Sequence, residues 1–379
     1  TLTVNGTVTA GSNIDYRTNG DGGTLTVGGV VQAEGGLDFR TRGDGAWLRL
    51  ETEVGELGGD QLLIRTQGDN ADLAIERGLS FGMDVDAGVD FRVSGADSDL
   101  VTWGVIELSG DLDMWVTGGG DLGINDTLVA GGDVLLRTRN GGRVVVPCDM
   151  TLERGICLLG GASITIISDD DVDSAVELAA EVVDLSAGGD LVVDGDVNAG
   201  DLLLRNGYRR PSFTRIGGVA VLSGLLSVTN PGGDVDVTGA VSALGEIDID
   251  AGGGVVVEGS LQTLGGSRLG VNGGWFLAVD GSLVSSGGDV DISSETATAV
   301  HGEVTAQSGS IVIGGDDSIE LGESATFDWL DYWGEVAAPT LLPGGNATFD
   351  GASALHRVRR RGRGSDIVTI NIYDGDRQD

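Results

Sequence analysis

Carboxylate and guanidinium side chains recur in this sequence at spacings that could place them on one surface. The arginines Arg17, Arg40, Arg65, Arg92 and Arg137 share the local pattern apolar-x-apolar-Arg, and Asp15, Asp38, Asp90 and Asp113 fill the x position in several copies. Aspartates clustered beside arginine could supply acid–base catalysis on a polysaccharide. However, aspartates near turns also hydrogen-bond their own backbone, and a repeated pattern is distributed along the chain whereas an active site is one place. We therefore expect no catalytic residues here, and a polysaccharide lyase or hydrolase stays as an alternative.

The acidic run ISDDDVDSAVE at residues 167–177 is the best candidate for a metal site. Its carboxylates Asp169, Asp170, Asp171 and Asp173 are the ligand type that calcium prefers. The run lacks the glycine and the terminal glutamate of an EF-hand, and the sequence contains no series of nine-residue calcium-binding repeats. A solvated acidic segment is therefore the favoured interpretation and a calcium site the alternative, and we expect no other cofactor.

Other residues with reactive side chains are few. His301 and His356 are far apart in the sequence, which argues against a histidine-based catalytic triad or a zinc site. The chain has no lysine, so Schiff-base chemistry is excluded. Cys148 and Cys157 are compatible with a disulfide in an oxidising compartment and equally with two buried thiols.

The net charge restricts the partners of this protein. The 379 residues carry 59 Asp and Glu against 22 basic residues, a formal net charge of −37, which would repel nucleic acids and anionic membrane surfaces. No apolar run is long enough to insert into a membrane. The sequence starts at Thr1 without a charged leader, which suggests a processed product, and we expect an extracellular or cell-surface protein.

The elements that carry the arginines are predicted to be short strands. With Trp115 in the position between Arg92 and Arg137, the spacings of the repeat are 23, 25, 27, 23 and 22 residues. Within each copy, apolar residues alternate with polar ones, which is the period of a strand. Each strand is followed by a corner such as NGDGG, RGDGA or QGDNA, where glycine and asparagine allow positive φ angles.

A second form of the repeat occupies the later part of the chain. Copies begin at Gly239, Gly259, Gly281 and Gly302, at steps of 20, 22 and 21 residues, and no convincing helix lies between the strands. This pattern excludes an alternating strand–helix fold and is too short for propeller blades. The sequence therefore predicts an all-β parallel β-helix (β-solenoid) with about 20–27 residues per coil, in which like residues stack from coil to coil.

The later repeat also resembles a known family. Its pattern Gly-x-apolar-x-x-x-Gly-x-apolar-x-apolar, followed by a Gly-Gly corner, is similar to the passenger repeats of filamentous-haemagglutinin-like secreted bacterial adhesins, most clearly over residues 186–325. The resemblance implies a right-handed parallel β-helix and a secreted, surface-associated role.

The expected domain organisation has three parts. Residues 1–325 form the solenoid, with arginine–threonine coils in 1–160, an acidic insertion or irregular coil in 161–185 and glycine-rich coils in 186–325. Residues 326–355 form an aromatic capping or interface segment, and residues 356–379 combine an arginine-rich stretch with a final strand for subunit docking.

Both ends of a solenoid expose strand edges that must be capped or paired. We expect a subunit interface there, made by apolar, aromatic and arginine residues at the two ends of the chain. These residues are Leu2, Val4, Trp329, Tyr332, Trp333, Arg357, Arg359, Arg360, Arg361, Arg363, Ile367, Val368, Ile370, Ile372 and Tyr373. The leading hypothesis is a non-enzymatic structural protein that assembles with itself head to tail into an extracellular filament. The alternative is an adhesin that binds a glycan or a cell-surface partner.

Overall fold

The computed structural model describes residues 1–33, 35–51, 62–76, 79–80, 88–108, 110–146, 156–159, 163–168, 171–174, 177–207, 212–307, 311–315, 318–321, 326–329, 340–343 and 346–349. Throughout these residues the secondary structure consists of strands joined by turns and bends, without a helix. Accordingly, no helix that could cross a membrane occurs in this part of the chain.

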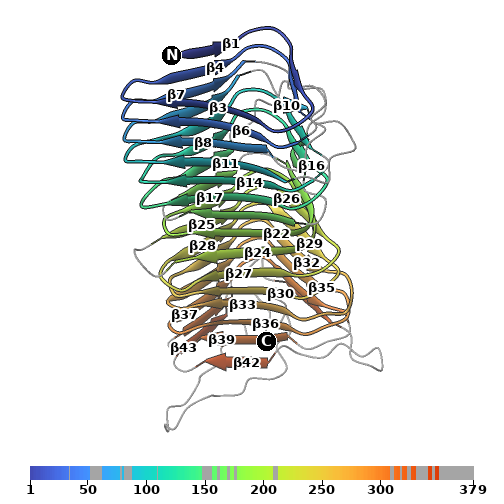
Figure 1. The fold of residues 1–379 in the computed structure, drawn as a ribbon. Helices are drawn as coiled ribbons and strands as arrows, with labels where there is room; N and C mark the ends of the chain where they lie inside the picture. The colour runs from blue at the N-terminus through green and yellow to red at the C-terminus, as the bar shows by residue number, and fades with distance from the viewer. Residues whose placement is uncertain are drawn as a thin grey trace, which may run out of the picture. The chain divides into compact units, whose positions relative to one another are not determined.

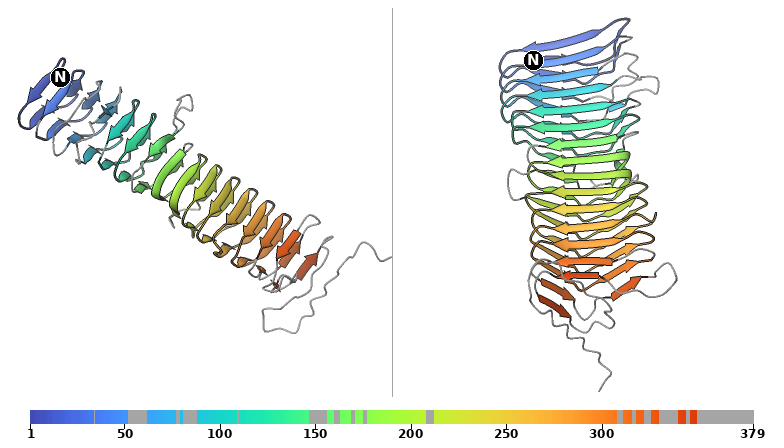
Figure 2. Two further views of the ribbon diagram at one scale, coloured as in Figure 1. Left: turned by 90° about the vertical axis from the view of Figure 1, so that its right-hand side faces the viewer. Right: turned by 90° about the horizontal axis from the view of Figure 1, so that it is seen from below.

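The chain divides into two compact units, residues 1–198 and residues 199–379. Each unit is a parallel β-solenoid of the right-handed type, in which one coil contributes up to three short strands (Figure 1). We call the three sides of the coil the first, second and third face, in the order in which the chain reaches them. Figure 2 shows how, within each unit, the strands of one face follow each other from coil to coil.

The strands of the first unit are assigned to the faces as follows. The first face holds β1 (Leu2–Val4), β4 (Thr24–Val27), β7 (Trp47–Leu50), β9 (Asp72–Ile75), β12 (Leu100–Thr102), β15 (Leu122–Ile124), β18 (Val144–Val146), β21 (Val172–Ser174) and β23 (Leu191–Val193). The second face holds β2 (Val8–Ala10), β5 (Val31–Ala33), β10 (Leu79–Ser80), β13 (Ile106–Leu108), β16 (Leu128–Ala130) and β19 (Ile156–Leu159). The third face holds β3 (Ile14–Asn19), β6 (Leu37–Arg42), β8 (Leu62–Gln67), β11 (Val89–Ser94), β14 (Leu112–Thr117), β17 (Val134–Arg139) and β20 (Ser163–Ser168). The longer β22 (Glu177–Ala187) pairs with both β19 and β20, so it runs along the second and third faces.

The strands of the second unit follow the same scheme. The first face holds β25 (Phe213–Ile216), β28 (Asp234–Val237), β31 (Val255–Val257), β34 (Phe276–Val279), β37 (Ala297–Val300), β40 (Ser318–Leu321) and β43 (Asn346–Phe349). The second face holds β26 (Val219–Leu222), β29 (Ala240–Ala243), β32 (Ser260–Thr263), β35 (Ser282–Ser285), β38 (Glu303–Ala306) and β41 (Thr326–Trp329). The third face holds β27 (Leu226–Asn230), β30 (Ile247–Ala251), β33 (Leu269–Gly273), β36 (Val290–Ser294), β39 (Ile311–Gly315) and β42 (Thr340–Pro343). The longer β24 (Val197–Asn206) runs along the second and third faces, and its later part pairs with β27.

The register of the strands confirms both forms of the repeat. On the third face of the first unit, Arg17 pairs with Arg40, Arg40 with Arg65, Arg65 with Arg92, Arg92 with Trp115 and Trp115 with Arg137. On the second face of the second unit, residues 240, 260, 282 and 303 pair in the same way, each following one of the repeat glycines. The predicted all-β parallel solenoid is therefore the observed fold, and the sequence spacing equals the length of a coil.

The core of each unit is a column of stacked side chains. In the first unit Phe39, Ile64, Phe91 and Met114 occupy equivalent inward positions on successive third-face strands, and each is almost completely buried. Tyr16 begins this column and stacks on Phe39 with ring centroids 5.7 Å apart and an interplanar angle of 6°. Each large side chain buried in this way stabilises the fold by roughly 1.5–3 kcal/mol.

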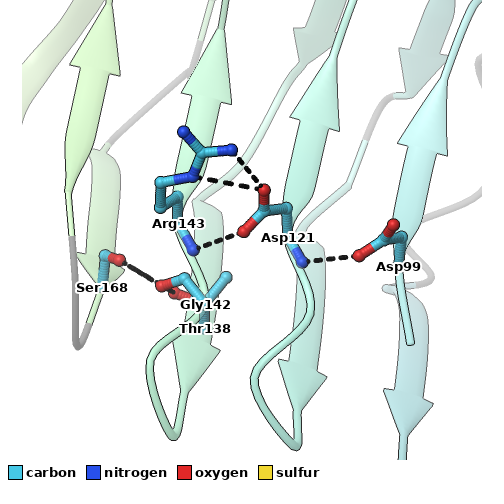
Figure 3. A network of polar contacts seen from close by, with 6 residues as sticks. All are labelled: Asp99, Asp121, Thr138, Gly142, Arg143 and Ser168. Carbon is cyan, nitrogen blue, oxygen red and sulfur yellow. Dashed lines mark hydrogen bonds and ion pairs between the residues drawn. The ribbon is translucent and has the colours of Figure 1, made fainter. Parts of the chain in front are cut away.

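Polar side chains satisfy the backbone where the chain turns inside the coil. In the close-up of Figure 3, Thr138 donates to the Gly142 carbonyl at 2.6 Å, and Ser168 from the next coil donates to the same carbonyl at 2.7 Å. The two hydroxyl oxygens, Thr138 Oγ1 and Ser168 Oγ, lie 2.9 Å apart. These buried hydroxyls occupy the last inward position of their strands, so they take the place of an apolar residue where backbone carbonyls would otherwise lack a donor.

Strands also occur in the segments for which an insertion and a cap were expected. Within 161–185 lie β20, β21 and the first part of β22, all paired with neighbouring coils. Within 326–355 lie β41, β42 and β43, which pair in parallel with β38, β39 and β40. Residues 356–379, the expected docking segment, lie outside the described residues.

Candidate functional site

The outward side chains of the third face in the first unit form a groove that we call the arginine groove. Because β3, β6, β8, β11 and β14 are paired in register, their outward residues make straight rows across the coils. The groove has a volume of about 480 Å³. Its lining comprises Arg17, Asn19, Arg40, Thr41, Arg42, Arg65, Thr66, Gln67, Arg92, Val93, Ser94, Trp115 and Thr117. It thus contains five arginines and no carboxylate.

Most of the stacked arginines are held by an aspartate two residues earlier on the same strand. Arg92 binds Asp90 through two contacts, from Nε to Oδ1 at 2.8 Å and from Nη2 to Oδ2 at 2.6 Å. Arg40 binds Asp38 in the same two-pronged manner, with Nε to Oδ1 at 2.6 Å, and Arg17 binds Asp15 with Nε to Oδ1 at 2.7 Å. The hydrogen bonds with Asp38 and Asp90 raise the pKa of Arg40 and of Arg92.

Arg65 differs from the other arginines of this row. Its strand carries Leu63 where the strands on either side carry Asp38 and Asp90. No ion pair of Arg65 is found in the described residues, and its Nε is buried without a hydrogen-bond partner there. Arg65 is thus a half-buried guanidinium placed between Arg40 and Arg92, at the strand spacing of about 4.8 Å.

Trp115 closes one end of the groove. Its ring lies under three guanidinium groups, with the Cζ atoms of Arg137, Arg139 and Arg92 at 4.7, 5.1 and 5.6 Å from the ring centroid. Cation–π contacts of this kind attract guanidinium groups to the ring face, so arginines can stack here without a carboxylate. Arg137 also binds Asp113 of the preceding coil, with Nη2 to Oδ2 at 2.6 Å, so the aspartate beside Trp115 is used by the next arginine.

Aspartates at the corners of the coils border the groove on its other side. Asp44 and Asp69 stand in the turns that follow β6 and β8. Asp44 Oδ1 accepts a hydrogen bond from the backbone N–H of Asp69 at 3.1 Å, and Asp69 Oδ1 accepts one from Ala96 at 3.0 Å. The positive strip of the groove is therefore narrow, with carboxylates along both edges.

The corner aspartates form hydrogen bonds from one coil to the next. Asp99 Oδ1 accepts from the N–H of Asp121 at 2.8 Å, and Asp121 Oδ1 accepts from the N–H of Arg143 at 2.9 Å (Figure 3). Arg143 returns to Asp121 Oδ2 with its side chain, from Nη2 at 2.8 Å. These aspartates were expected to bond the backbone of their own turn, whereas here they bond the following coil. The reason is that stacked turns bring the next coil's N–H groups within reach.

Two carboxylates have a raised pKa for reasons of burial. Burial is the largest cause for Asp99, and the nearby carboxylates of Asp72, Asp121 and Asp97 add to it, while the hydrogen bond from Asp121 opposes it. Burial also raises the pKa of Asp236, with a further contribution from Glu258 and an opposing one from Arg215. Asp99 belongs to the corner series on the opposite side of the turn from the arginine groove, so it adds no acid to that groove.

The calcium candidate is only partly covered by the structure. Asp169 and Asp170 lie outside the described residues. Asp171 Oδ1 accepts from the N–H of Asp190 at 2.8 Å, which is the corner contact seen elsewhere, and Asp173 is exposed on β21. Within the residues that the structure describes, no group of three or more potential ligands is close enough to hold a metal ion.

The other expected site residues are mostly outside the described part of the chain. Tyr332, Trp333 and all interface residues from Arg357 to Tyr373 lie there, as do Cys148 and His356. Trp329 and Cys157 lie on β41 and β19, and Leu2 and Val4 lie on β1. The disulfide and the interface therefore stay predictions.

His301 contacts carboxylates of both neighbouring coils. Its Nδ1 binds Asp280 Oδ1 of the preceding coil at 2.8 Å, and its Nε2 lies 3.9 Å from Glu320 Oε1 of the next coil.

Sequence reasoning did not single out Arg65 as different from the other arginines. The signal was present, since LLIRTQ has leucine in the position where IDYRTN, LDFRTR and VDFRVS have aspartate. Its importance depends on the register, which places this one strand between two arginines that are already paired with carboxylates. Arg42, another groove arginine for which no ion pair is found among the described residues, likewise stands out only when its neighbours across the coils are known.

Comparison of the chain with protein-family models, with curated proteins and with solved structures finds no match. The similarity to filamentous-haemagglutinin-like passenger repeats therefore extends to the parallel β-solenoid fold and no further.

Proposed function

We propose that this protein is a non-enzymatic structural β-solenoid that acts outside the cell and presents the arginine groove as a binding surface. The observation that carries the proposal is the row of arginines stacked in register on a sheet face. Stacked coils share backbone hydrogen bonds on both sides, so side chains on such a face are held at fixed spacing without a ligand. A prearranged surface loses little entropy when a partner binds.

The geometry favours binding over catalysis because the repeated acidic residues already have structural contacts. Asp15, Asp38 and Asp90 are held in two-pronged pairs with arginine. The corner aspartates accept backbone N–H groups of the following coil. A general acid or base needs a carboxyl group that can exchange protons with a substrate, and these carboxylates are already used to hold the coils together.

Two measurements test this function. Incubation of the purified chain with polygalacturonate should release neither unsaturated nor reducing ends, because no catalytic carboxylate is expected. Antibodies raised against the chain should label intact source cells without permeabilisation. Release of new chain ends would show an enzyme instead, and labelling that requires permeabilisation would contradict the extracellular location.

A second candidate function is the subunit of a head-to-tail filament. In the described residues, β1, β2 and β3 each pair with a strand on one side only, as do β41, β42 and β43. Unpaired strand edges are templates for pairing with another chain, and a contact between two different surfaces repeats without closing. The expected partner is a second copy of this protein.

Light scattering on the full chain and on a chain lacking residues 356–379 separates the two candidates. A filament subunit should give species that grow with concentration, and the deletion should abolish this growth. A scaffold that only binds a ligand should be monodisperse in both forms. Growth of both forms would show that residues 356–379 are not the docking segment.

A further inference from the structure

We propose that the arginine groove binds an acidic polysaccharide, with Arg65 holding a carboxylate or sulfate group of one sugar unit. The inference deepens the binding function proposed above and rests on it. It assigns a ligand class and a central residue to a surface that the sequence had indicated only as a repeated aspartate–arginine pattern.

The charge distribution around Arg65 favours the binding of an anion. Arg65 has an arginine directly before it and another directly after it in the row, and like charges opposite each other on neighbouring strands are destabilising. Arg40 and Arg92 are compensated by Asp38 and Asp90, whereas Arg65 has Leu63 in that position. An anionic group bound at Arg65 would supply the missing negative charge.

The guanidinium of Arg65 also has N–H donors without a hydrogen-bond partner in the described residues. A guanidinium has five N–H donors in a planar fork that matches carboxylate and sulfate oxygens. Arg65 Nε is buried and has no partner in the described residues, so a ligand would meet the other N–H groups of this guanidinium. Arg42 is exposed and lies on the adjacent strand β6, two residues further along, roughly 8 Å from Arg65 between Cα atoms by sheet geometry. Two cationic groups at this separation can bind two acidic groups of one polysaccharide chain.

The rest of the lining suits a sugar better than a peptide. Beside the arginines, the groove offers the amides of Asn19 and Gln67 and the hydroxyls of Ser94 and Thr117, which can bond sugar hydroxyl groups. One common way for an extended peptide to bind is to add to a sheet edge. β8 is paired on both sides, with β6 and with β11, so its backbone beneath the groove has no free edge to which a peptide could add.

The borders of the groove exclude wider polyanions. Beyond the lining, the carboxylates of Asp38 and Asp90 follow one side of the groove, and those of Asp44 and Asp69 lie in the corners on the other. Nucleic-acid affinity comes largely from many phosphate contacts, about 6–10 in strongly salt-dependent cases, whereas among the described residues this strip offers two arginines without an ion pair. The volume of about 480 Å³ lies within the roughly 300–1,000 Å³ typical of ligand sites, which corresponds to a few sugar units.

Titration calorimetry of the full chain at physiological salt tests the proposal. The probes are polygalacturonate for carboxylates and dextran sulfate for sulfates, with neutral dextran, poly-L-glutamate and single-stranded DNA for comparison. We expect at least one of the two acidic polysaccharides to bind, and the three comparison polymers to bind at least tenfold more weakly. The affinities for polygalacturonate and for dextran sulfate show whether the groove prefers carboxylate or sulfate groups.

Two substitutions test the role of Arg65 in opposite ways. Arg65→Gln removes the cation, and Leu63→Asp keeps it but supplies the carboxylate that the neighbouring strands have. Both should raise the Kd for the acidic polysaccharide by about tenfold or more, as expected for the loss of charge-assisted hydrogen bonds. The matched controls are Arg49→Gln, which removes a charge from β7 on the first face, and Leu135→Asp, which adds one on β17 beyond the groove lining. Both controls should leave the Kd unchanged within about twofold.

The outcomes separate the ligand from the wider function. Binding that is lost in Arg65→Gln and Leu63→Asp and kept in the controls supports the inference, provided that the four variants unfold at similar temperatures. Equal binding of poly-L-glutamate or DNA overturns the ligand class. Binding that is insensitive to both groove variants, or no binding of either polysaccharide, overturns the inference while the structural function stands. Cleavage of the polysaccharide overturns the structural function itself.

Discussion

Aspartate in this protein is a structural residue at the corners of the coils. The series Asp72, Asp99, Asp121 passes from coil to coil, each Oδ1 accepting the backbone N–H of the next member. Charge-assisted bonds of a carboxylate to backbone N–H groups are stronger than neutral ones. Yet the corner position buries Asp99, and stacking at the spacing of a coil adds nearby carboxylates; burial raises the pKa of Asp99 most, and these neighbours add to it.

The raised pKa of Asp99 gives a prediction about pH. A carboxyl whose pKa is higher in the folded state than in the unfolded state favours folding when protonated, and that contribution is lost as the pH rises through the folded-state pKa. Asp99→Asn keeps an acceptor oxygen for the Asp121 N–H and removes the charge. We expect the variant to melt about 2 °C higher than the parent at pH 7, and the difference to vanish well below pH 3.8, where the carboxyl of the parent is protonated in both states.

Asp111→Asn is the matched control, because Asp111 makes the same contact, to the N–H of Asp133 at 2.9 Å, with an exposed carboxylate. It should show no gain at pH 7. A lower melting temperature for Asp99→Asn at pH 7 would mean that the charge of Asp99 stabilises the corner more than its burial and its acidic neighbours oppose it.

The turns that end the third-face strands depend on glycine. Gly43, Gly68 and Gly95 have φ angles of 136°, 142° and 147°, in the left-handed region. Each donates its N–H to the coil that follows, as Gly68 does to the Ser94 carbonyl at 2.9 Å. A Cβ on Gly68 would collide with the carbonyl group of Gly43, because successive turns lie directly on each other.

A pair of glycine substitutions tests this stacking. Gly68→Ala should destabilise the protein by about 3 kcal/mol or more, from the left-handed φ together with the clash. Gly45→Ala has a left-handed φ of 65° and open space around the added methyl group, so it should cost about 1 kcal/mol. Urea unfolding followed by circular dichroism measures both. Equal losses in the two variants would show that close approach of the turns is not what requires glycine at position 68.

The charge of the whole molecule works against its compact state. With 59 acidic and 22 basic residues, at least 37 carboxylates have no arginine to neutralise them. The ion pairs of the third face are partly exposed, and pairs of this kind contribute roughly 0–1 kcal/mol each. Self-repulsion is therefore expected to outweigh the local pairs in the response to salt.

We expect the melting temperature to rise when NaCl increases from 10 mM to 1 M, since the Debye length falls from about 30 to about 3 Å. Differential scanning calorimetry checks this, with KCl in place of NaCl to separate screening from ion binding. A melting temperature that falls with both salts would show that the arginine–aspartate pairs dominate the electrostatics.

The amino-acid sequence by itself determined the fold class and the register. The period of the arginine pattern and of the repeat glycines equals the observed offset between paired strands, because a parallel solenoid places like residues on each other in every coil. The alternation of apolar and polar residues likewise predicted strands, and the apolar residues that start three of them, Ile14, Leu37 and Leu62, are buried. These are local, periodic properties, so a one-dimensional pattern contains them.

Only the tertiary structure decided which arginine differs and which groups the corner aspartates bind. Arg65 matches its neighbours in the sequence pattern, and its lack of a carboxylate becomes significant because pairing with β6 and β11 encloses it between arginines. The aspartates bond a coil that lies 19–27 residues away in the sequence. Contacts between coils depend on how the turns stack in space, and no pattern within one repeat specifies them.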